Sequence, residues 1–116
     1  MRIIIITGAN RGLGKALVDV ALKDENSFII SLSRSLHLEH KGINSNKLLF
    51  LKTDLSKPYS DSIFEIICQK THPEDVFYFF NNASIILPIQ KIGDFKELDI
   101  ETSIKVNVKY PVNLIN

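Results

Sequence analysis

Apolar residues occur along this chain in two alternating patterns, as short continuous runs and as longer stretches with helical spacing. Four runs are short, rich in branched or aromatic side chains and bounded by polar residues, which is typical of strands in a buried sheet. They lie at Ile3–Ile6, Phe28–Leu32, Leu48–Leu51 and Val76–Phe80. The first run contains only isoleucine, and we expect it to be buried on both faces.

Helical spacing begins directly after the first run. Apolar residues that recur every three or four positions predict one buried face of a helix. These residues are Leu13, Ala16, Leu17, Val20 and Ala21. The helix is expected to end near the polar residues 24–26.

Two further helices are predicted downstream. One spans about Asp61–Thr71, with Ser56 as a candidate cap. The other starts near Phe95, and Pro111 should remove one of its hydrogen bonds and bend it. Four apolar residues fall on or near one face of this last helix: Leu98, Ile104, Val108 and Val112. The segment Ser35–Asn46 fits a loop or a short helix, and a right-handed crossover favours a helical element there.

The order of elements is therefore strand, helix, strand, strand, helix, strand, helix. Continuous apolar strands joined by amphipathic helices indicate an α/β fold, with a mostly parallel sheet covered on both faces. A length of 116 residues fits one domain. A flavodoxin-like or response-regulator domain shares this alternation, but a receiver domain requires clustered acids after the first strand and residues 8–14 contain none.

The net charge and the cysteine content exclude several kinds of partner and site. The net charge of +1 provides no field that would attract nucleic acid or an anionic membrane, so neither partner is expected. Cys68 is the only cysteine, which excludes an intramolecular disulfide and a multi-cysteine metal site. The three histidines lack metal-ligand spacing, so no metal site is expected either. We expect Cys68 to be a helix residue of the protein core and the protein to be cytoplasmic.

A glycine-rich turn lies between the first strand and the first helix, at Thr7, Gly8, Ala9, Asn10, Arg11, Gly12, Leu13 and Gly14. Glycines at this position permit a tight turn, close approach of the backbone to a pyrophosphate and close packing of the helix on the strand. The N-terminus of the helix then offers free N–H groups to phosphates. The position of the motif predicts a dinucleotide site more strongly than the glycines alone would.

The end of the second strand indicates which dinucleotide is bound. Sites for NAD usually place a carboxylate there, which binds the ribose 2′-hydroxyl. This chain has Ser33 and Arg34 at that place, and no acid occurs between Ser27 and Leu38. Because a guanidinium can pair with a 2′-phosphate and Arg11 could reach the same group, NADP(H) is favoured over NAD(H).

The glycine turn resembles that of the short-chain dehydrogenase/reductase family, in which it reads T-G-x3-G-x-G. The segment Thr53–Leu55 is similar to the family as well. The resemblance implies that Asp54 accepts a hydrogen bond from the adenine amino group and that Leu55 packs near the adenine ring. Within the family, the turn and the Ser-Arg-Ser after the second strand are most similar to carbonyl reductases of the sepiapterin or benzil reductase kind.

Two segments of the second half extend the resemblance to essentially the whole chain. Asn81, Asn82, Ala83 and Ser84 follow the fourth strand where the family has N-N-A-G. The resemblance implies that the first asparagine fixes the sheet and that the Asn-Ala backbone lines the cofactor. Ser84 departs from the pattern, and it would be strained if its backbone required a positive φ. Asn107 matches the family asparagine that joins the catalytic proton relay.

The resemblance implies a Rossmann-type, doubly wound parallel sheet with strand order 3-2-1-4, of which this chain is the N-terminal half. The family's catalytic tyrosine and lysine form Y-x3-K, and none of the three tyrosines here is followed four positions later by lysine. Residues 1–116 are therefore expected to be a single NADP-binding domain that is truncated before that region and inactive by itself. The fourth strand would then be an open apolar edge, which favours self-association.

Two functions remain open on this basis. The first is an NADP(H)-dependent oxidoreductase that transfers a hydride between nicotinamide and a carbonyl or alcohol substrate, as a homo-oligomer in its full-length form. The second is a non-catalytic dinucleotide-binding module, a truncated or degenerate relative.

Overall fold

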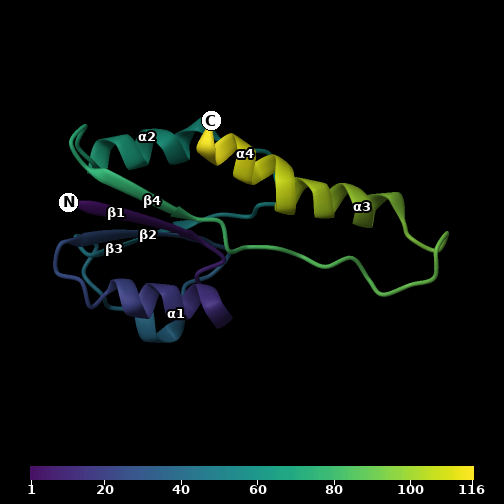
Figure 1. Cartoon of the computed structure of the whole chain (residues 1–116), viewed down its shortest axis with the longest axis horizontal. Helices are drawn as coiled ribbons and strands as arrows, with labels where there is room; N and C mark the ends of the chain where they lie inside the picture. Colours follow the sequence, from purple (N-terminus) through teal and green to yellow (C-terminus); the bar gives the residue numbers. More distant parts are fainter.

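A computed structural model describes residues 1–116 as one parallel four-stranded sheet with helices on both faces (Figure 1). The strand order is β3-β2-β1-β4, as the resemblance implies. The strands are β1 (Arg2–Thr7), β2 (Ser27–Ser33), β3 (Leu48–Lys52) and β4 (Val76–Phe80). Each predicted apolar run lies inside one of them, with at most one added residue at either end.

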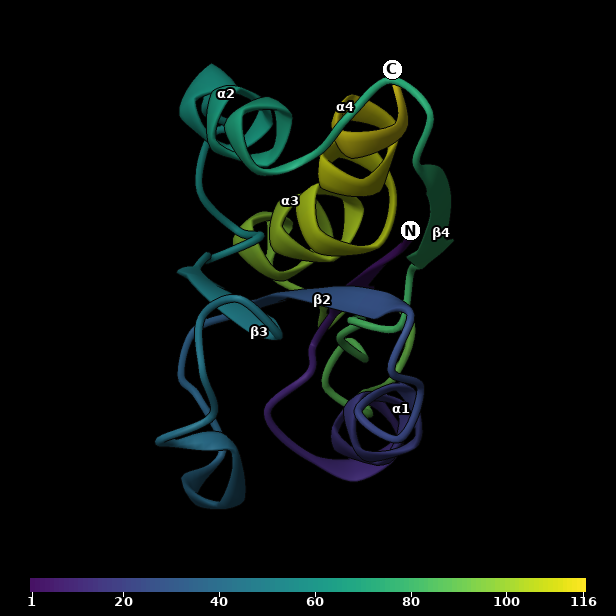
Figure 2. The same cartoon turned by 90° about the vertical axis from the view of Figure 1, so that its left-hand side faces the viewer.

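The helices form a layer on each side of the sheet. They are α1 (Gly12–Ala21), the short 3-10 helix η1 (Leu38–His40), α2 (Asp61–Lys70), α3 (Glu97–Ile104), the π-helical segment η2 (Lys105–Lys109) and α4 (Tyr110–Ile115). Seen along the sheet, α2 and α4 lie over one face and α1 lies over the other (Figure 2). The predicted crossover helix within Ser35–Asn46 is thus a single turn, η1.

The alternation of side chains along the strands produces two separate cores. Ile3 and Ile5 of β1 pack with Phe28 and Ile30 of β2 in the core beneath α2 and α4. The intervening residues Ile4 and Ile6 pack on the opposite face, in the core beneath α1. All seven residues of β2 are buried, which explains why its sequence shows no polar alternation.

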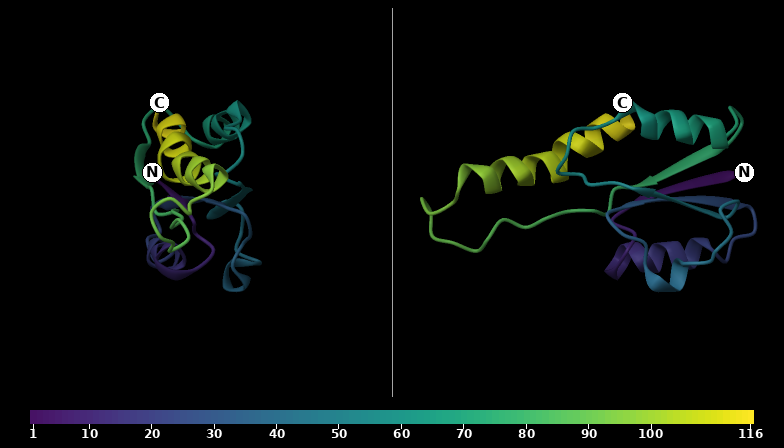
Figure 3. Two further views of the ribbon diagram at one scale, coloured as in Figure 1. Left: turned by 90° about the vertical axis from the view of Figure 1, so that its right-hand side faces the viewer. Right: turned by 180° about the vertical axis from the view of Figure 1, so that it is seen from behind.

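The fourth strand lies at the edge of the sheet, beside β1 (Figure 3). Its apolar side chains are open to solvent, with Val76 54%, Phe77 48%, Tyr78 46% and Phe80 41% exposed. An apolar edge with free backbone N–H and C=O groups is a template for pairing with another chain.

We therefore expect the 116-residue chain to self-associate in dilute buffer, as measured by multi-angle light scattering. Tyr78→Lys should reduce the association, because a charge on an edge strand opposes strand pairing. Phe64→Lys is the matched control, since Phe64 is 62% exposed on α2, away from the edge. A monodisperse wild-type monomer would contradict the expectation.

Four predictions about the helices were wrong. The face predicted for α1 is mostly exposed: Leu13 and Val20 are 69% and 65% exposed, and of its five residues only Ala21 is buried. Ser56 does not cap a helix; its N–H and hydroxyl donate to Asp54, and Ser60 caps α2 by accepting from the N–H of Ser62. Cys68 is exposed on α2 and is not a core residue. The predicted face of the last helix is also exposed, and the buried residues are Val106, Tyr110 and Pro111.

The last helix departs from α geometry where Pro111 requires it. Proline has no N–H to donate and its ring crowds the carbonyl one turn earlier. The π-helical segment η2 occupies that turn, and α4 resumes after it. α3 buries none of its residues, because it extends beyond the end of the sheet (Figure 1). No helix combines the length and the apolar character that crossing a membrane requires.

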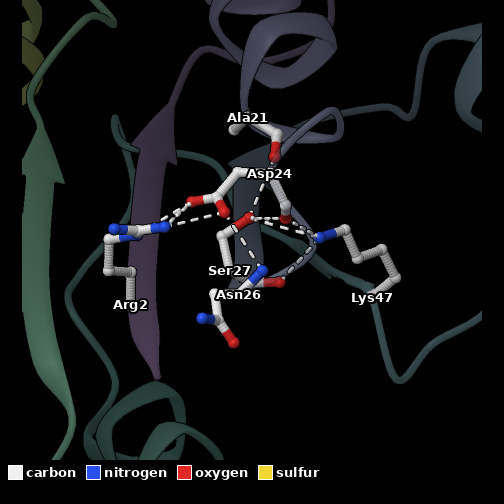
Figure 4. Close-up of polar contacts among 6 residues, drawn as sticks. All are labelled: Arg2, Ala21, Asp24, Asn26, Ser27 and Lys47. Carbon is white, nitrogen blue, oxygen red and sulfur yellow. Dashed lines mark hydrogen bonds and ion pairs between the residues drawn. The ribbon is translucent and has the colours of Figure 1, made fainter.

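A polar cluster stabilises the amino-terminal edge of the sheet (Figure 4). The Nε and Nη2 of Arg2 each donate to Asp24 at 2.8 Å. The Nζ of Lys47 donates to the carbonyl oxygens of Asp24 and Ser27, and the Ser27 hydroxyl donates to the carbonyl of Ala21. Donors and positive charge at the C-terminal end of α1 satisfy its last carbonyls.

The Asp24 carboxylate makes this cluster sensitive to acid. The hydrogen bond from Arg2, followed by that from the N–H of Asn26, lowers the pKa of Asp24 below its ordinary value of 3.8. The unfolded chain therefore takes up this proton at a higher pH than the folded chain does. The stabilisation is present above pH 3.8 and is lost as the pH falls through the folded pKa.

We expect the free energy of unfolding, measured by urea denaturation, to fall as the pH drops below this value. Asp24→Asn should show a smaller acid-induced fall than the wild type. Asp94→Asn is the control, because Asp94 is exposed and makes no ion pair. Equal acid sensitivity in the wild type and Asp24→Asn would contradict the assignment.

Candidate functional site: a cavity at the carboxyl ends of the strands

The carboxyl ends of the parallel strands surround a cavity of about 430 Å³. Crevices at this edge are where open α/β sheets bind ligands. Eleven of the fourteen predicted cofactor residues line it: Gly8, Asn10, Arg11, Gly12, Leu13, Ser33, Arg34, Asp54, Leu55, Asn82 and Ala83. The other three, Thr7, Gly14 and Asn81, do not.

The three glycines of the turn have different roles. Gly8 and Gly12 adopt positive φ values of 65° and 55°, which L-residues with a side chain rarely adopt. A Cβ on Gly12 would meet no atom within 4 Å, so the backbone there borders open space. A Cβ on Gly14 would lie 2.0 Å from the carbonyl oxygen of Gly8, so Gly14 permits the close packing of α1 on the turn.

The N-terminus of α1 points free donors at this cavity. Arg11 is the N-cap residue, and its side chain makes no capping hydrogen bond. The first turn contains no acid that would occupy the N–H groups or repel an anion. An uncapped helix N-terminus behind a glycine-rich turn is suited to bind phosphate.

The end of β2 forms the adjoining wall of the cavity. Ser33 is buried and its hydroxyl donates to the carbonyl of Ser35 at 2.7 Å, whereas the Arg34 side chain is exposed. The Nδ2 of Asn10 donates to the Ser35 hydroxyl at 3.2 Å, which joins the glycine turn to this loop. The wall therefore contains the Arg34 guanidinium and Ser33, and this segment contributes no carboxylate.

Asp54 forms a turn after β3. Its Oδ1 accepts from the N–H of Ser56 at 2.9 Å and from the Ser56 hydroxyl at 2.6 Å. These bonds, with the Ser56 hydroxyl as the larger cause, lower the pKa of Asp54. The residue thus stays ionised, and its carboxylate lines the cavity as an acceptor.

Thr7 connects the end of β1 to the segment after β4. Its buried hydroxyl accepts from the N–H groups of Asn82 at 3.1 Å and of Ala83 at 3.0 Å. The Nδ2 of Asn82 in turn donates to the carbonyls of Thr7 and Gly8 at 3.1 and 3.2 Å. The second asparagine therefore joins the ends of β1 and β4, whereas Asn81 is exposed and its expected role stays a prediction.

Thr7→Val is expected to lower the free energy of unfolding by about 1–3 kcal/mol, because two N–H groups lose their acceptor while the shape is kept. Urea denaturation measures the loss. Thr71→Val is the control, since its hydroxyl only donates to the carbonyl of Ile67 at the end of α2. Equal losses in the two variants would contradict the role given to Thr7.

Asn107 anchors the segment that follows β4. Its Oδ1 accepts from the N–H of Ile85 and its Nδ2 donates to the carbonyl of Ile85, both at 2.9 Å. The side chain therefore holds the loop on η2, and Asn107 is not among the residues that line the cavity. The neighbouring Ser84 is unstrained, because no residue other than glycine has a positive φ.

The cavity is also lined by residues that were not predicted to contact the cofactor. They are Leu32, Thr53, Ser56, Ser84, Ile85, Thr102 and Val106. Leu32, Thr53 and Ser56 adjoin predicted residues, so their position next to strand ends was a usable signal. Thr102 and Val106 come from the last helix, and only the tertiary fold brings them to this edge. No group of three or more His, Cys, Asp or Glu side chains could hold a metal ion.

Comparison with known proteins places this chain in a family. The chain is 29% identical to benzil reductase ((S)-benzoin forming) of Bacillus cereus over 98% of its length and 48% of that protein. The structure of Sniffer from Caenorhabditis elegans is 26% identical, with a TM-score of 0.82 over 96% of this chain and 48% of that one. A structure of 4-hydroxyisoleucine dehydrogenase with NADH is also 26% identical, with a TM-score of 0.77 over 99% of this chain and 46% of that one.

The chain thus spans about half the length of these relatives, 48% of benzil reductase. The match to the short chain dehydrogenase family covers residues 2–116 of this chain. The glycine turn, the strand order 3-2-1-4 and the cavity at the carboxyl edge agree with that match. This protein belongs to the short-chain dehydrogenase family.

Proposed function

We propose that this chain is the cofactor-binding part of an NADP(H)-dependent oxidoreductase acting on a carbonyl or alcohol substrate. The observation that carries the proposal is the cavity that joins an uncapped helix N-terminus to a wall with Arg34 and no acid. The first feature suits a pyrophosphate and the second suits a 2′-phosphate. Residues 1–116 would form a single domain for this purpose.

The residues present fit a nicotinamide dinucleotide. Gly12 leaves space at the turn that a side chain would fill, and Gly8 and the α1 N-terminus complete a cradle for the phosphates. Asp54 would accept from the adenine amino group, and Leu55 would pack beside the ring. Asn82 and Ala83 would line the cofactor on its other side. When bound, the nicotinamide supplies or accepts the hydride.

The preference for NADP(H) over NAD(H) rests on charge. Arg34 and Arg11 both line the cavity, together with Ser33 at the end of β2. A guanidinium forms bidentate hydrogen bonds with phosphate, whereas a ribose 2′-hydroxyl is usually met by a carboxylate. The relative solved with NADH therefore does not decide the cofactor of this chain.

The similarity to benzil reductase supports a small carbonyl substrate. In the full-length protein we propose a homo-oligomer in the cytoplasm, in which Asn107 belongs to the proton relay. The non-catalytic dinucleotide-binding module is the second candidate. It is favoured by Ser84, which stands where the family has glycine, and it shares the cofactor site with the first.

Calorimetric titration of the 116-residue chain with NADPH and NADH tests the cofactor assignment. We expect binding of NADPH to be tighter by about tenfold or more, because charge-assisted hydrogen bonds to a phosphate each contribute over about 1.4 kcal/mol. Equal affinity, or tighter binding of NADH, would contradict the proposal.

A second experiment separates the two candidate functions. The coding DNA is read beyond codon 116, and the product of the whole open frame is assayed for NADPH oxidation with benzil. A frame that continues with a serine and Y-x3-K, together with turnover, supports the oxidoreductase. A stop codon after codon 116 would make the binding module the better account.

A further inference from the structure

Four polar side chains join α1 to η1, and none of them lines the cavity. The Nζ of Lys15 lies 2.7 Å from Asp19 Oδ2 and 2.6 Å from Glu39 Oε2. The Nε2 of His40 lies 2.8 Å from Asp19 Oδ1. We call this group, Lys15, Asp19, Glu39 and His40, the α1–η1 clamp. It bridges the helix of the glycine turn and the segment that follows β2.

The clamp is anchored by a buried group. His40 is only 2% exposed, so its imidazole has a fixed position against Asp19. The same contacts lower the pKa of Asp19, first through the Lys15 hydrogen bond and then through His40. Next to it, the N–H of Glu39 donates to Nδ1 of His37, which closes the start of η1. An exposed ion pair alone would hold the segment weakly, whereas this network has one end in the core.

The clamp holds the loop that carries Arg34. Only residues 35–37 separate Arg34 from η1. On its other side this loop is tied to the glycine turn by the Asn10–Ser35 hydrogen bond. The loop is therefore fixed at two places, to α1 through η1 and to the glycine turn through Asn10. The proposed phosphate site has two parts, the N-terminus of α1 and Arg34. The first belongs to α1, and the second is connected to α1 through η1.

We propose that the α1–η1 clamp positions Arg34 and thereby sets the preference for a nucleotide with a 2′-phosphate. This inference rests on the proposed NADP(H) function. A guanidinium recognises phosphate through a planar fork, so a loop held in place loses less conformational freedom on binding. Lys15, Asp19, Glu39 and His40 are positioning residues, because they act through the loop and not on the ligand.

The acidic residues of the clamp allow a sharp test, because positioning and simple electrostatics predict opposite changes in anion binding when these residues are neutralised. Asp19 and Glu39 are acidic, so by Coulomb repulsion alone their neutralisation would strengthen the binding of an anion. If they position Arg34, their neutralisation weakens the binding of the 2′-phosphate. Asp19→Asn and Glu39→Gln therefore separate positioning from simple electrostatics. Glu39 is 68% exposed, so its substitution leaves the core intact.

The experiment measures binding of 2′,5′-ADP and 5′-AMP to the 116-residue chain by calorimetry at one ionic strength. The readout is the ratio of the two dissociation constants, because a general loss of structure would weaken both ligands. In Asp19→Asn and Glu39→Gln we expect the preference for 2′,5′-ADP to fall about threefold or more, with 5′-AMP binding changed by less than about twofold. Lys15→Arg should retain the preference, since it keeps both ion pairs.

Asp24→Asn is the matched control. It replaces the same type of side chain in another ion pair, the one with Arg2 (Figure 4). This pair lies at the amino-terminal ends of the strands, away from the cavity. Its preference for 2′,5′-ADP should equal that of the wild type.

Two outcomes overturn the inference, and they are distinguishable. If Asp19→Asn and Glu39→Gln keep or increase the preference while Arg34→Ala abolishes it, the clamp has no positioning role and the proposed function stands. If the wild-type chain binds 2′,5′-ADP no better than 5′-AMP, the NADP(H) assignment fails and the inference fails with it.

Discussion

Arg34→Ala is expected to weaken binding of NADPH about 10- to 100-fold while leaving the affinity for NADH within about twofold, because hydrogen bonds to a charged group contribute about 1.5–3 kcal/mol. Arg34 is exposed at the mouth of the cavity, directly after β2. It makes no ion pair within the chain, so its removal leaves the fold unchanged. Calorimetric titration with both cofactors measures the effect.

The control for this substitution is Arg2→Ala. Arg2 is another exposed arginine, but it lies at the amino-terminal end of β1 and pairs with Asp24. Its loss should change the binding of neither cofactor. If Arg34→Ala weakened NADPH and NADH equally, Arg34 would act on the shared part of the two molecules and the 2′-phosphate assignment would be wrong.

Gly14→Ala is expected to destabilise the protein by about 3 kcal/mol or more, the upper range for overpacking a tightly packed position. The new Cβ would lie 2.0 Å from the carbonyl oxygen of Gly8 and 2.6 Å from Nδ2 of Asn82. The first of these atoms is backbone and cannot move without opening the glycine turn. The second belongs to the side chain that joins the ends of β1 and β4.

Urea denaturation measures this effect, with Gly42→Ala as the matched control. Gly42 has a φ of +88°, and a Cβ there would meet no atom within 4 Å. Its substitution therefore carries only backbone strain, about 1–2 kcal/mol. A loss for Gly14→Ala no larger than that for Gly42→Ala would show that the packing of α1 on the turn adapts to a methyl group.

The sequence predicted the sheet and much of the site because their signals are local. A parallel strand buried on both faces is a continuous apolar run, and β2, with all its residues buried, is the clearest case. The glycine turn is recognisable because positive φ at Gly8 and Gly12 requires glycine. Arg34 could be assigned to the cavity because strand ends meet at one edge of a parallel sheet.

Predictions about helix faces were less successful, since a helix face is defined by the element that it packs against. The apolar spacing of Leu98, Ile104 and Val108 marks a face that is exposed in this chain. Val106 and Tyr110 pack on the sheet instead, after the π-helical turn shifts the register. Cys68 was misassigned for the same reason, because helical spacing does not tell which side of α2 meets the sheet.

The sequence by itself determined the α/β alternation, the strands, the glycine turn and the absence of an acid after β2. These properties depend on residues that are neighbours in the chain. Only the tertiary structure decided that Asn82 and not Asn81 joins the strand ends, that Asn107 holds Ile85, and that Lys15 and Asp19 reach Glu39 and His40. Some of these contacts connect residues more than 20 positions apart, and one distinguishes between two adjacent asparagines. The local sequence pattern contains no information on such contacts.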